Sequence, residues 1–176
     1  MNQKSIFRTI TLNIPTSIAL IVGLLFLAGC ESTIQPTLNT KVSALYAGAT
    51  IEVDLVGINT SEYQIWKAKS VNDYFTSDDQ FRDAAVKKTL YFGEQKKSSQ
   101  TFSSSDPIWT QWVAKGCAFV VVIADLPGYV KDEQVDRRRQ LIPLDSKLWS
   151  GAPSDITITV SPTGIQLLPS PEVVDF

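Results

Sequence analysis

Short runs in which apolar and polar residues alternate recur along the chain, and they constrain its fold more than any other feature. Residues 51–55 place Ile, Val and Leu at every second position, and residues 156–160 repeat the pattern with threonines between the apolar residues. A period of two is typical of a strand with one buried face. Residues 117–124 are apolar on both faces and predict a strand in the centre of a sheet.

Further strands and two helices follow from the rest of the pattern. A capping box at Ser77 predicts a helix over 78–88, and the pair Asp106-Pro107 predicts another over 107–115. Other extended segments are expected at 41–46, 63–67, 89–92, 100–104, 140–144 and 165–168. Many short strands with one or two inserted helices predict a mainly β domain in which two sheets form a sandwich.

The N-terminal segment has the organisation of a secretory signal peptide. Lys4 and Arg8 precede an apolar run over 17–27, and small residues follow it. The run is shorter than the roughly 20 residues that a transmembrane helix needs. Leu27-Ala28-Gly29-Cys30 resembles the lipobox of bacterial lipoproteins. This resemblance implies cleavage before Cys30 and a diacylglycerol on its thiol, and two or three acyl chains anchor a protein durably.

This interpretation divides the chain into four parts. Residues 1–29 form the signal peptide, 30–40 a lipidated flexible tether, 41–170 the β-sandwich domain and 171–176 a loose C-terminal tail. Glu31 follows the lipobox, and by resemblance to lipoproteins of Gram-negative bacteria it favours the outer over the inner membrane. The expected location is the cell envelope, at the periplasmic face of the outer membrane.

Composition excludes several functions. The chain has no histidine, which rules out Ser-His-Asp and Cys-His catalysis and histidine-ligated zinc within it. Its net charge of −2 gives no reason to expect a nucleic acid partner. With Cys30 lipidated, Cys117 has no disulfide partner in the chain, and its apolar surroundings favour a packed, inert thiol. Carboxylate chemistry stays open in principle as an enzymatic route, but we expect no enzymatic activity, no cofactor and no metal.

The order of several short motifs resembles a known family. After the lipobox come Val53-Asp54-Leu55-Val56, Tyr63-Gln64-Ile65-Trp66-Lys67, Gly93-Glu94-Gln95, the apolar strand ending in Ala124-Asp125, and Trp149 ahead of Ile156-Thr157-Ile158-Thr159-Val160. This order is similar to that of the outer-membrane lipoprotein of type VI secretion systems. The resemblance implies a transthyretin-like sandwich whose loops bind the periplasmic end of an inner-membrane partner.

The predicted fold class is thus mainly β, a transthyretin-like or immunoglobulin-like β-sandwich with one or two short inserted helices. In the family, a longer proline-containing loop after the Val-Asp-Leu-Val strand touches the partner, whereas only residues 57–62 are expected here. The helix over 107–115 and the charged stretch 131–139 also depart from the family pattern. Candidate partner-binding residues are Asn59 and Thr60 in the loop and the triplet Arg137, Arg138 and Arg139, a docking patch for an acidic partner.

Two other kinds of site are open. Exposed tryptophans would form a platform for glycan or another small ligand, although the three-residue spacing of Trp109 and Trp112 favours core packing. Trp66 and Trp149 complete that set. Asp132, Glu133 and Asp136 offer carboxylates to calcium, although the adjacent arginines favour mutual neutralisation on a solvated loop.

Two functional hypotheses follow. The first is a lipid-anchored periplasmic interaction module without catalysis, in particular the outer-membrane lipoprotein of a type VI secretion membrane complex. The second is an envelope lipoprotein that binds glycan or a small ligand through exposed tryptophans.

Overall fold

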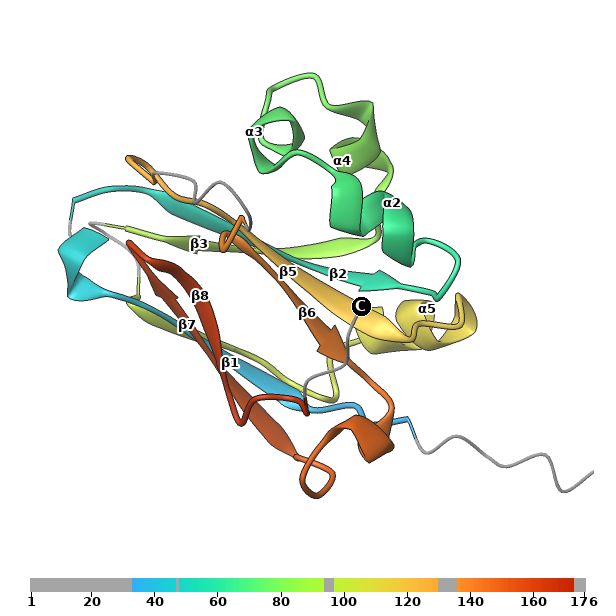
Figure 1. The fold of residues 1–176 in the computed structure, drawn as a ribbon. Coiled ribbons are helices and arrows are strands. Elements are labelled where there is room, and N and C mark those ends of the chain that lie inside the picture. Colours follow the sequence, from blue (N-terminus) through green and yellow to red (C-terminus); the bar gives the residue numbers. More distant parts are fainter. Residues whose placement is uncertain (1–32, 47, 94–96, 130–135, 173–176) are drawn as a thin grey trace, which may run out of the picture. The chain divides into compact units, whose positions relative to one another are not determined.

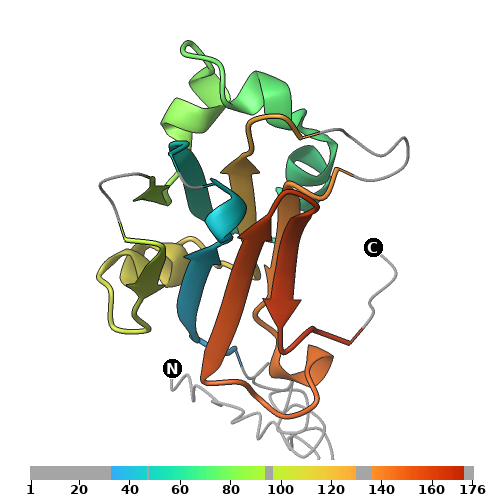
Figure 2. The ribbon, with the colours of Figure 1, turned by 90° about the vertical axis from the view of Figure 1, so that its left-hand side faces the viewer.

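The structure is a computed structural model that describes residues 33–46, 48–93, 97–129 and 136–172. In this part of the chain two four-stranded sheets pack against each other (Figures 1 and 2). One sheet has the strand order β4-β1-β7-β8 and the other β3-β2-β5-β6, which confirms the predicted mainly β sandwich. The strands are β1 (Thr37–Val42), β2 (Ile51–Ile58), β3 (Lys87–Phe92), β4 (Ser99–Phe102), β5 (Phe119–Asp125), β6 (Arg139–Pro143), β7 (Asp155–Ser161) and β8 (Gly164–Leu168).

Strand pairing brings distant parts of the sequence together. β1 pairs antiparallel with β4 and parallel with β7, where Thr37 lies opposite Asp155. The pairs within the second sheet are all antiparallel, with β2 between β3 and β5. The strands predicted over 156–160 and 165–168 are confirmed as β7 and β8, which pair antiparallel and are joined by a turn in which Ser161 faces Gly164.

The two central strands of the second sheet, β2 and β5, are buried on both faces. Ile51, Val53 and Leu55 point into the core between the two sheets, as their alternation predicts. Val56 and Ile58 belong to a second apolar cluster on the outer face. β5 divides in the same way, which explains why its sequence is apolar throughout.

A helical insert between β2 and β3 covers this outer face (Figure 1). It contains α2 (Tyr63–Ala68), α3 (Val71–Tyr74) and α4 (Gln80–Ala84). The insert's side chains Trp66, Val71 and Tyr74 belong to this second cluster and pack against the sheet. The insert replaces the short loop that was expected after β2.

Two predictions in this region are wrong. The strand expected over 63–67 is α2, because Tyr63 and Trp66, three residues apart, both turn towards the sheet. The helix expected over 78–88 is only α4, since β3 already begins at Lys87. Its cap is Asp79, whose Oδ1 accepts the Arg82 N–H at 2.7 Å, rather than Ser77.

The predicted second helix is confirmed as α5 (Ile108–Ala114), and it inserts two tryptophans into the core. Trp112 lies against the backbone of Gly57, where a Cβ atom would stand 2.3 Å from the Trp112 Cγ. Gly57 was expected to end its strand. It lies instead inside β2, and its missing side chain leaves room for the indole.

The domain begins earlier than predicted. Thr33 forms an isolated bridge with Asp145, and the Ile34 N–H donates to the Leu144 carbonyl oxygen at 2.8 Å. β1 starts at Thr37, inside the range given to the tether, and a short 3-10 turn, η1 (Ala44–Tyr46), takes the place of the strand expected over 41–46. The alternation of β1 is hard to see in the sequence because one of its buried positions is Thr40.

The loops gather at two opposite ends of the sandwich. We call one the entry end, since the chain enters there at Thr33; Thr60, Gly116, Pro143 and Leu148 lie beside it. We call the other the far end. It carries Tyr46 and Gly93, together with the β7–β8 turn at Gly164, which packs on Arg137. A second 3-10 turn, η2 (Ser146–Leu148), lies at the entry end.

Candidate partner-binding surface

The structure separates the two groups of predicted partner-binding residues. Asn59 and Thr60 directly follow β2, whose last residue, Ile58, pairs with Phe119 at the entry end. Arg139 pairs with Ile123 near the opposite end of the same sheet. The predicted residues therefore do not form one surface.

Asn59 holds the turn that leads into α2. Its Oδ1 accepts the Glu62 N–H at 3.1 Å, and the Glu62 Oε2 accepts the Asn59 N–H at 3.0 Å. This reciprocal arrangement satisfies backbone donors where the helix begins. Thr60 is exposed in the same turn and is the member of this pair that is open to a partner.

The arginine triplet is not an open patch. The Arg138 side chain is buried and makes a bidentate pair with Asp136, with Nε–Oδ1 and Nη2–Oδ2 distances of 2.9 and 2.7 Å. Its Nη1 donates to the Asn72 Oδ1 at 2.7 Å. Burial alone would raise the pKa of Asp136, but the hydrogen bonds and charge of Arg138 outweigh it and lower that pKa. The expectation of a solvated charged loop is wrong for Arg138.

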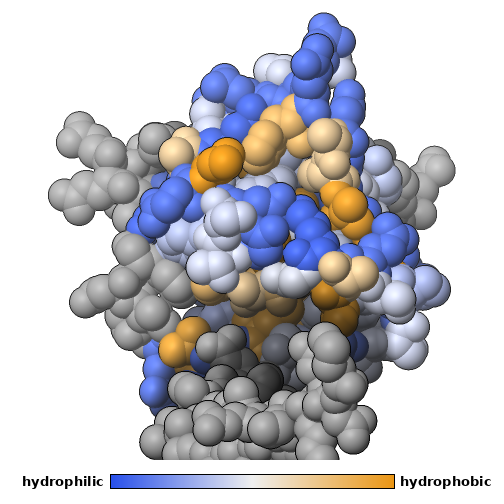
Figure 3. All heavy atoms as spheres, turned by 90° about the vertical axis from the view of Figure 1, so that its right-hand side faces the viewer, coloured by the Kyte–Doolittle hydropathy of each residue, from blue (hydrophilic) through white to orange (hydrophobic). Residues whose placement is uncertain are grey.

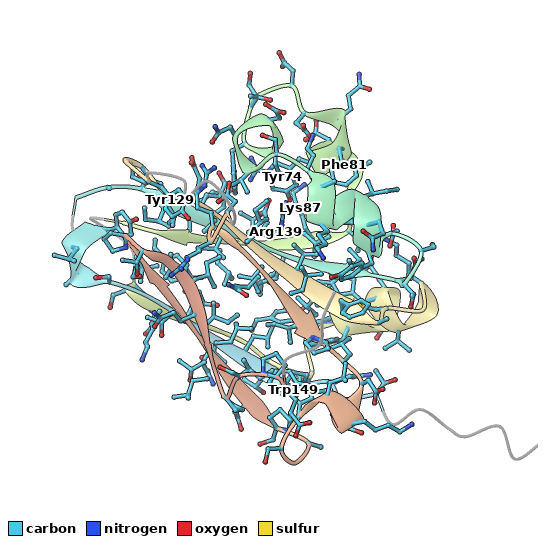
Figure 4. All side chains as sticks on the ribbon, viewed as in Figure 1. Tyr74, Phe81, Lys87, Tyr129, Arg139 and Trp149 are labelled. Carbon is cyan, nitrogen blue, oxygen red and sulfur yellow. The ribbon has the colours of Figure 1, made fainter. Side chains whose placement is uncertain are left out.

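Arg139 also has a structural role, and Arg137 remains exposed. The Arg139 guanidinium donates to the carbonyl oxygens of Lys67 and Lys69 at 2.5 Å each, at the end of α2 (Figure 4). Arg137 makes its hydrogen bonds through the backbone, with the Tyr129 hydroxyl and the Ile165 N–H. Its side chain is the part of the triplet that a partner can reach.

A buried charge network was not anticipated from the sequence. Asp54 was expected on the polar face of a half-buried strand, yet it is fully buried beneath the helical insert. Its carboxylate accepts the Tyr74 hydroxyl at 2.9 Å, the Arg82 Nε at 2.9 Å and the Thr89 hydroxyl at 2.5 Å. Arg82 also pairs with Glu52. Tyr74, a tyrosine among the apolar residues of the insert, was the one sequence signal that could have pointed to a buried acceptor such as Asp54.

This network fastens the insert to the sheet. Every donor that faces Asp54 belongs to the insert or to β3. Burial and the neighbouring carboxylate raise the pKa of Tyr74 far above its usual value, so its hydroxyl stays protonated as a donor. The Arg82 guanidinium lies over the rings of Tyr74 and Phe75, which adds cation–π contacts.

The tryptophans do not form a ligand platform. All four side chains are at most 4% exposed. The indole N–H groups of Trp109, Trp112 and Trp149 donate to the carbonyl oxygens of Ser103, Val86 and Pro143. Trp149, labelled near the bottom of Figure 4, packs in the main apolar core between the two sheets. The premise of the glycan hypothesis is therefore wrong.

Cys117 is a packed thiol, as expected. It is buried, and its Sγ donates to the Phe119 carbonyl oxygen at 3.0 Å. Burial raises the pKa of the thiol to about 11. It is therefore almost entirely protonated at neutral pH and a poor nucleophile.

Each end of the sandwich is hollowed. The cavity at the entry end has a volume of about 460 Å³ and reaches Cys117 from Thr60 and Leu148. The cavity at the far end has a volume of about 500 Å³ and lies between Val42, Tyr46, Ile51 and Phe92. The buried Tyr46 hydroxyl has no hydrogen-bond partner among the described residues.

No three His, Cys, Asp or Glu side chains in the described part of the chain are close enough to hold a metal ion. Of the candidate calcium ligands, Asp132 and Glu133 lie outside the described residues, and Asp136 is paired with Arg138. No helix of the described ranges is long and apolar enough to cross a bilayer. Cys30 also lies outside these ranges.

Comparison with known proteins identifies structural neighbours. No protein-family model and no curated protein sequence matches the chain. A chain from the structure of the T6SS protein TssM C-terminal domain from EAEC aligns with a TM-score of 0.51 and 14% identity, covering 75% of this chain and 98% of that one. A chain of a type VI membrane complex aligns with a TM-score of 0.50 and 15% identity, covering 76% and 97%. Serratia marcescens Lip, a membrane bound component of the Type VI Secretion System, covers 75% of this chain and 94% of its own at 12% identity, with a TM-score of 0.45. At these identities the first two likenesses show a shared fold, the β-sandwich.

Proposed function

We propose that this chain is a lipid-anchored, non-catalytic component of a type VI secretion membrane complex. In this proposal the mature protein begins at Cys30, carries lipid on that thiol and lies at the periplasmic face of the outer membrane. Its sandwich binds another envelope protein, an inner-membrane component of the same complex.

One observation carries the proposal: a segment that resembles a lipobox precedes a sandwich whose fold is shared with chains of type VI structures. The order of motifs in the sequence supports the same assignment independently of the fold. The lack of histidine and the structural role of the buried Asp54 network support a binding role rather than catalysis. The burial of the tryptophans removes the argument for the alternative, a glycan-binding lipoprotein.

The lipid anchor is tested by Cys30→Ser. We expect the variant to remain folded and to move from the membrane fraction to the soluble periplasmic fraction, because the thiol that accepts the lipid is gone. Mass spectrometry of the wild-type protein should find Cys30 as a lipid-modified N-terminus. Cys117→Ser is the matched control and should stay in the membrane fraction. An intact leader with an unmodified Cys30 would contradict the proposal.

Partner binding is tested with the periplasmic domain of the type VI inner-membrane component from the same organism. We expect the purified sandwich to bind this domain in calorimetry. Thr60→Asp and Arg137→Glu change the exposed predicted contact at each end and leave the core intact. Loss of affinity in one variant would locate the contact, whereas absence of binding by the wild-type domain would remove the type VI assignment.

A further inference from the structure

Covalent geometry limits the distance between Cys30 and the folded domain. Thr33 is already tied to the sandwich by its bridge to Asp145, and Ile34 by its hydrogen bond to Leu144. An extended chain covers at most about 3.6 Å per residue, so the Cα of Cys30 lies no more than about 11 Å from that of Thr33. A lipid on Cys30 would therefore hold the entry end close to the membrane surface.

Among the described residues, three of the five exposed large apolar side chains lie on segments at this end: Ile65 on α2, Val113 on α5 and Leu168 at the end of β8, which are 58%, 52% and 71% exposed. The other two, Leu45 and Tyr91, are 80% and 45% exposed. Val113 lines the cavity at the entry end beside Thr33 and Thr60. Glu62, directly before α2, forms an ion pair there with Lys115, directly after α5. Leu168 pairs with Thr157, close to the start of β7.

The character of this end suits a neutral lipid surface. The Lys115 Nζ and Glu62 Oε1 atoms are 2.7 Å apart, so these two charges compensate each other. Figure 3 looks onto this side and shows several hydrophobic groups separated by hydrophilic ones. Apolar side chains that project from a surface held beside a bilayer gain free energy by entering its interfacial region.

We infer that the entry end lies on the phospholipid bilayer that holds the lipid of Cys30, and that Val113 and Ile65 contact its interfacial region. This inference rests on the lipidation in the proposed function. It assigns the two ends different neighbours, since β1 alone separates them by about 20 Å at 3.3 Å per residue. The far end then points away from the membrane and stays open to a protein partner.

The experiment uses the full lipidated chain in phosphatidylcholine vesicles that contain brominated phosphatidylcholine. A bimane fluorophore is attached to Val113→Cys or Ile65→Cys, and to Leu45→Cys as the control at the far end, where Leu45 is 80% exposed. Each variant carries Cys117→Ala, so that only the introduced thiol is labelled. We expect brominated lipid to quench the fluorophore at 113 and 65, with a blue shift of its emission, and to leave the one at 45 unchanged.

Mass spectrometry of the same samples separates the two ideas. Lipid on Cys30 together with equal or absent quenching at all three positions would overturn the inference and leave the lipid anchor intact. An unmodified Cys30 would overturn both. A Cys30→Ser version of the Val113→Cys protein should show no quenching; persistent quenching would contradict the claim that the short link imposes the contact.

Discussion

At the scale of single residues, the tightest steric constraint is the contact between Gly57 and Trp112. The glycine has ordinary backbone angles, so its role is to leave space rather than to adopt a special conformation. The indole occupies that space and also donates a hydrogen bond to the Val86 carbonyl oxygen at 2.9 Å. A side chain at position 57 therefore has to displace the rigid indole of Trp112, which its hydrogen bond to Val86 holds in place.

Gly57→Ala should lower the free energy of unfolding by roughly 1–3 kcal/mol, the usual cost of overpacking a core. Chemical denaturation monitored by tryptophan fluorescence measures it. Gly116→Ala is the control: its φ of +73° adds backbone strain, but nothing lies within 4 Å of the new methyl group. In a double-mutant cycle, Trp112→Leu should remove most of the cost at position 57. Equal costs of Gly57→Ala in both backgrounds would refute the steric explanation.

Asp54 is the residue whose charge the fold most needs. Asp54→Asn preserves the shape but removes the charge that compensates Arg82, and it replaces one of the two accepting oxygens by an NH2 group that cannot accept a hydrogen bond. Breaking a buried ion pair in this way costs about 3–5 kcal/mol. Asp83→Asn, on the exposed side of α4, should change stability by less than about 0.5 kcal/mol. A loss for Asp54→Asn no greater than for Asp83→Asn would show that the network is dispensable.

At the scale of secondary structure, side-chain hydrogen bonds to two strands of the second sheet, β2 and β6, hold the helical insert on that sheet. Arg82 reaches Asp54 on β2, and Arg139 on β6 donates to carbonyl oxygens at the end of α2. A cation in this position also interacts favourably with the helix dipole. The insert thus depends on the sheet for its conformation, since helices of four to six residues are not stable alone.

Arg139→Met should loosen α2 and α3 while the sandwich keeps its structure. Hydrogen bonds from a charged group contribute roughly 1.5–3 kcal/mol, which sets the expected loss. Hydrogen exchange should speed up in the backbone amides of residues 63–74 and remain slow in β2 and β5. Arg137→Met, which removes an exposed guanidinium, is the matched control and should leave both regions unchanged. A uniform change over the whole domain would contradict the local role.

Sequence patterns predicted the sandwich because its strands alternate, but they could not predict the insert. Residues 63–67 fit both a strand and a helix, since a short apolar pattern has no unique period. The burial of Asp54 depends on Tyr74 and Arg82, which reach it only after the insert has folded over the sheet. In the arginine triplet, neighbouring residues in the sequence have different burial because Arg138 turns to Asp136 and Arg139 to α2.

At the scale of the whole molecule, titration sets the pH range of stability. Backbone and Lys88 contacts lower the pKa of Asp106, and the pKa of Asp79 is also lowered: burial raises it, but its hydrogen bonds and charge contact with Lys69 outweigh that effect. Arg138 does the same for Asp136. Groups with lowered pKa stabilise the fold above their unfolded pKa of 3.8, and this contribution is lost as the pH falls through their folded pKa.

The unfolding free energy should therefore be level between pH 5 and 8, where no histidine titrates, and should fall below about pH 4. On the alkaline side, Cys117 has a raised folded pKa of about 11 against 9.0, so its contribution is present below pH 9 and lost as the pH approaches 11. Denaturant titrations over this range measure both limbs. Cys117→Ala should flatten part of the alkaline limb; an identical limb would show that the thiol does not contribute.

The position of β1 has a consequence for the order in which the sandwich folds. This strand lies between β4 and β7, and its parallel partner comes from the last part of the sequence. β1 cannot complete its hydrogen bonding until that last part of the chain is available to pair. Under the proposed lipidation, the segment ahead of β1 would meanwhile remain untied to the sandwich, and this late folding would keep Cys30 open to the enzymes that cut the leader and acylate it.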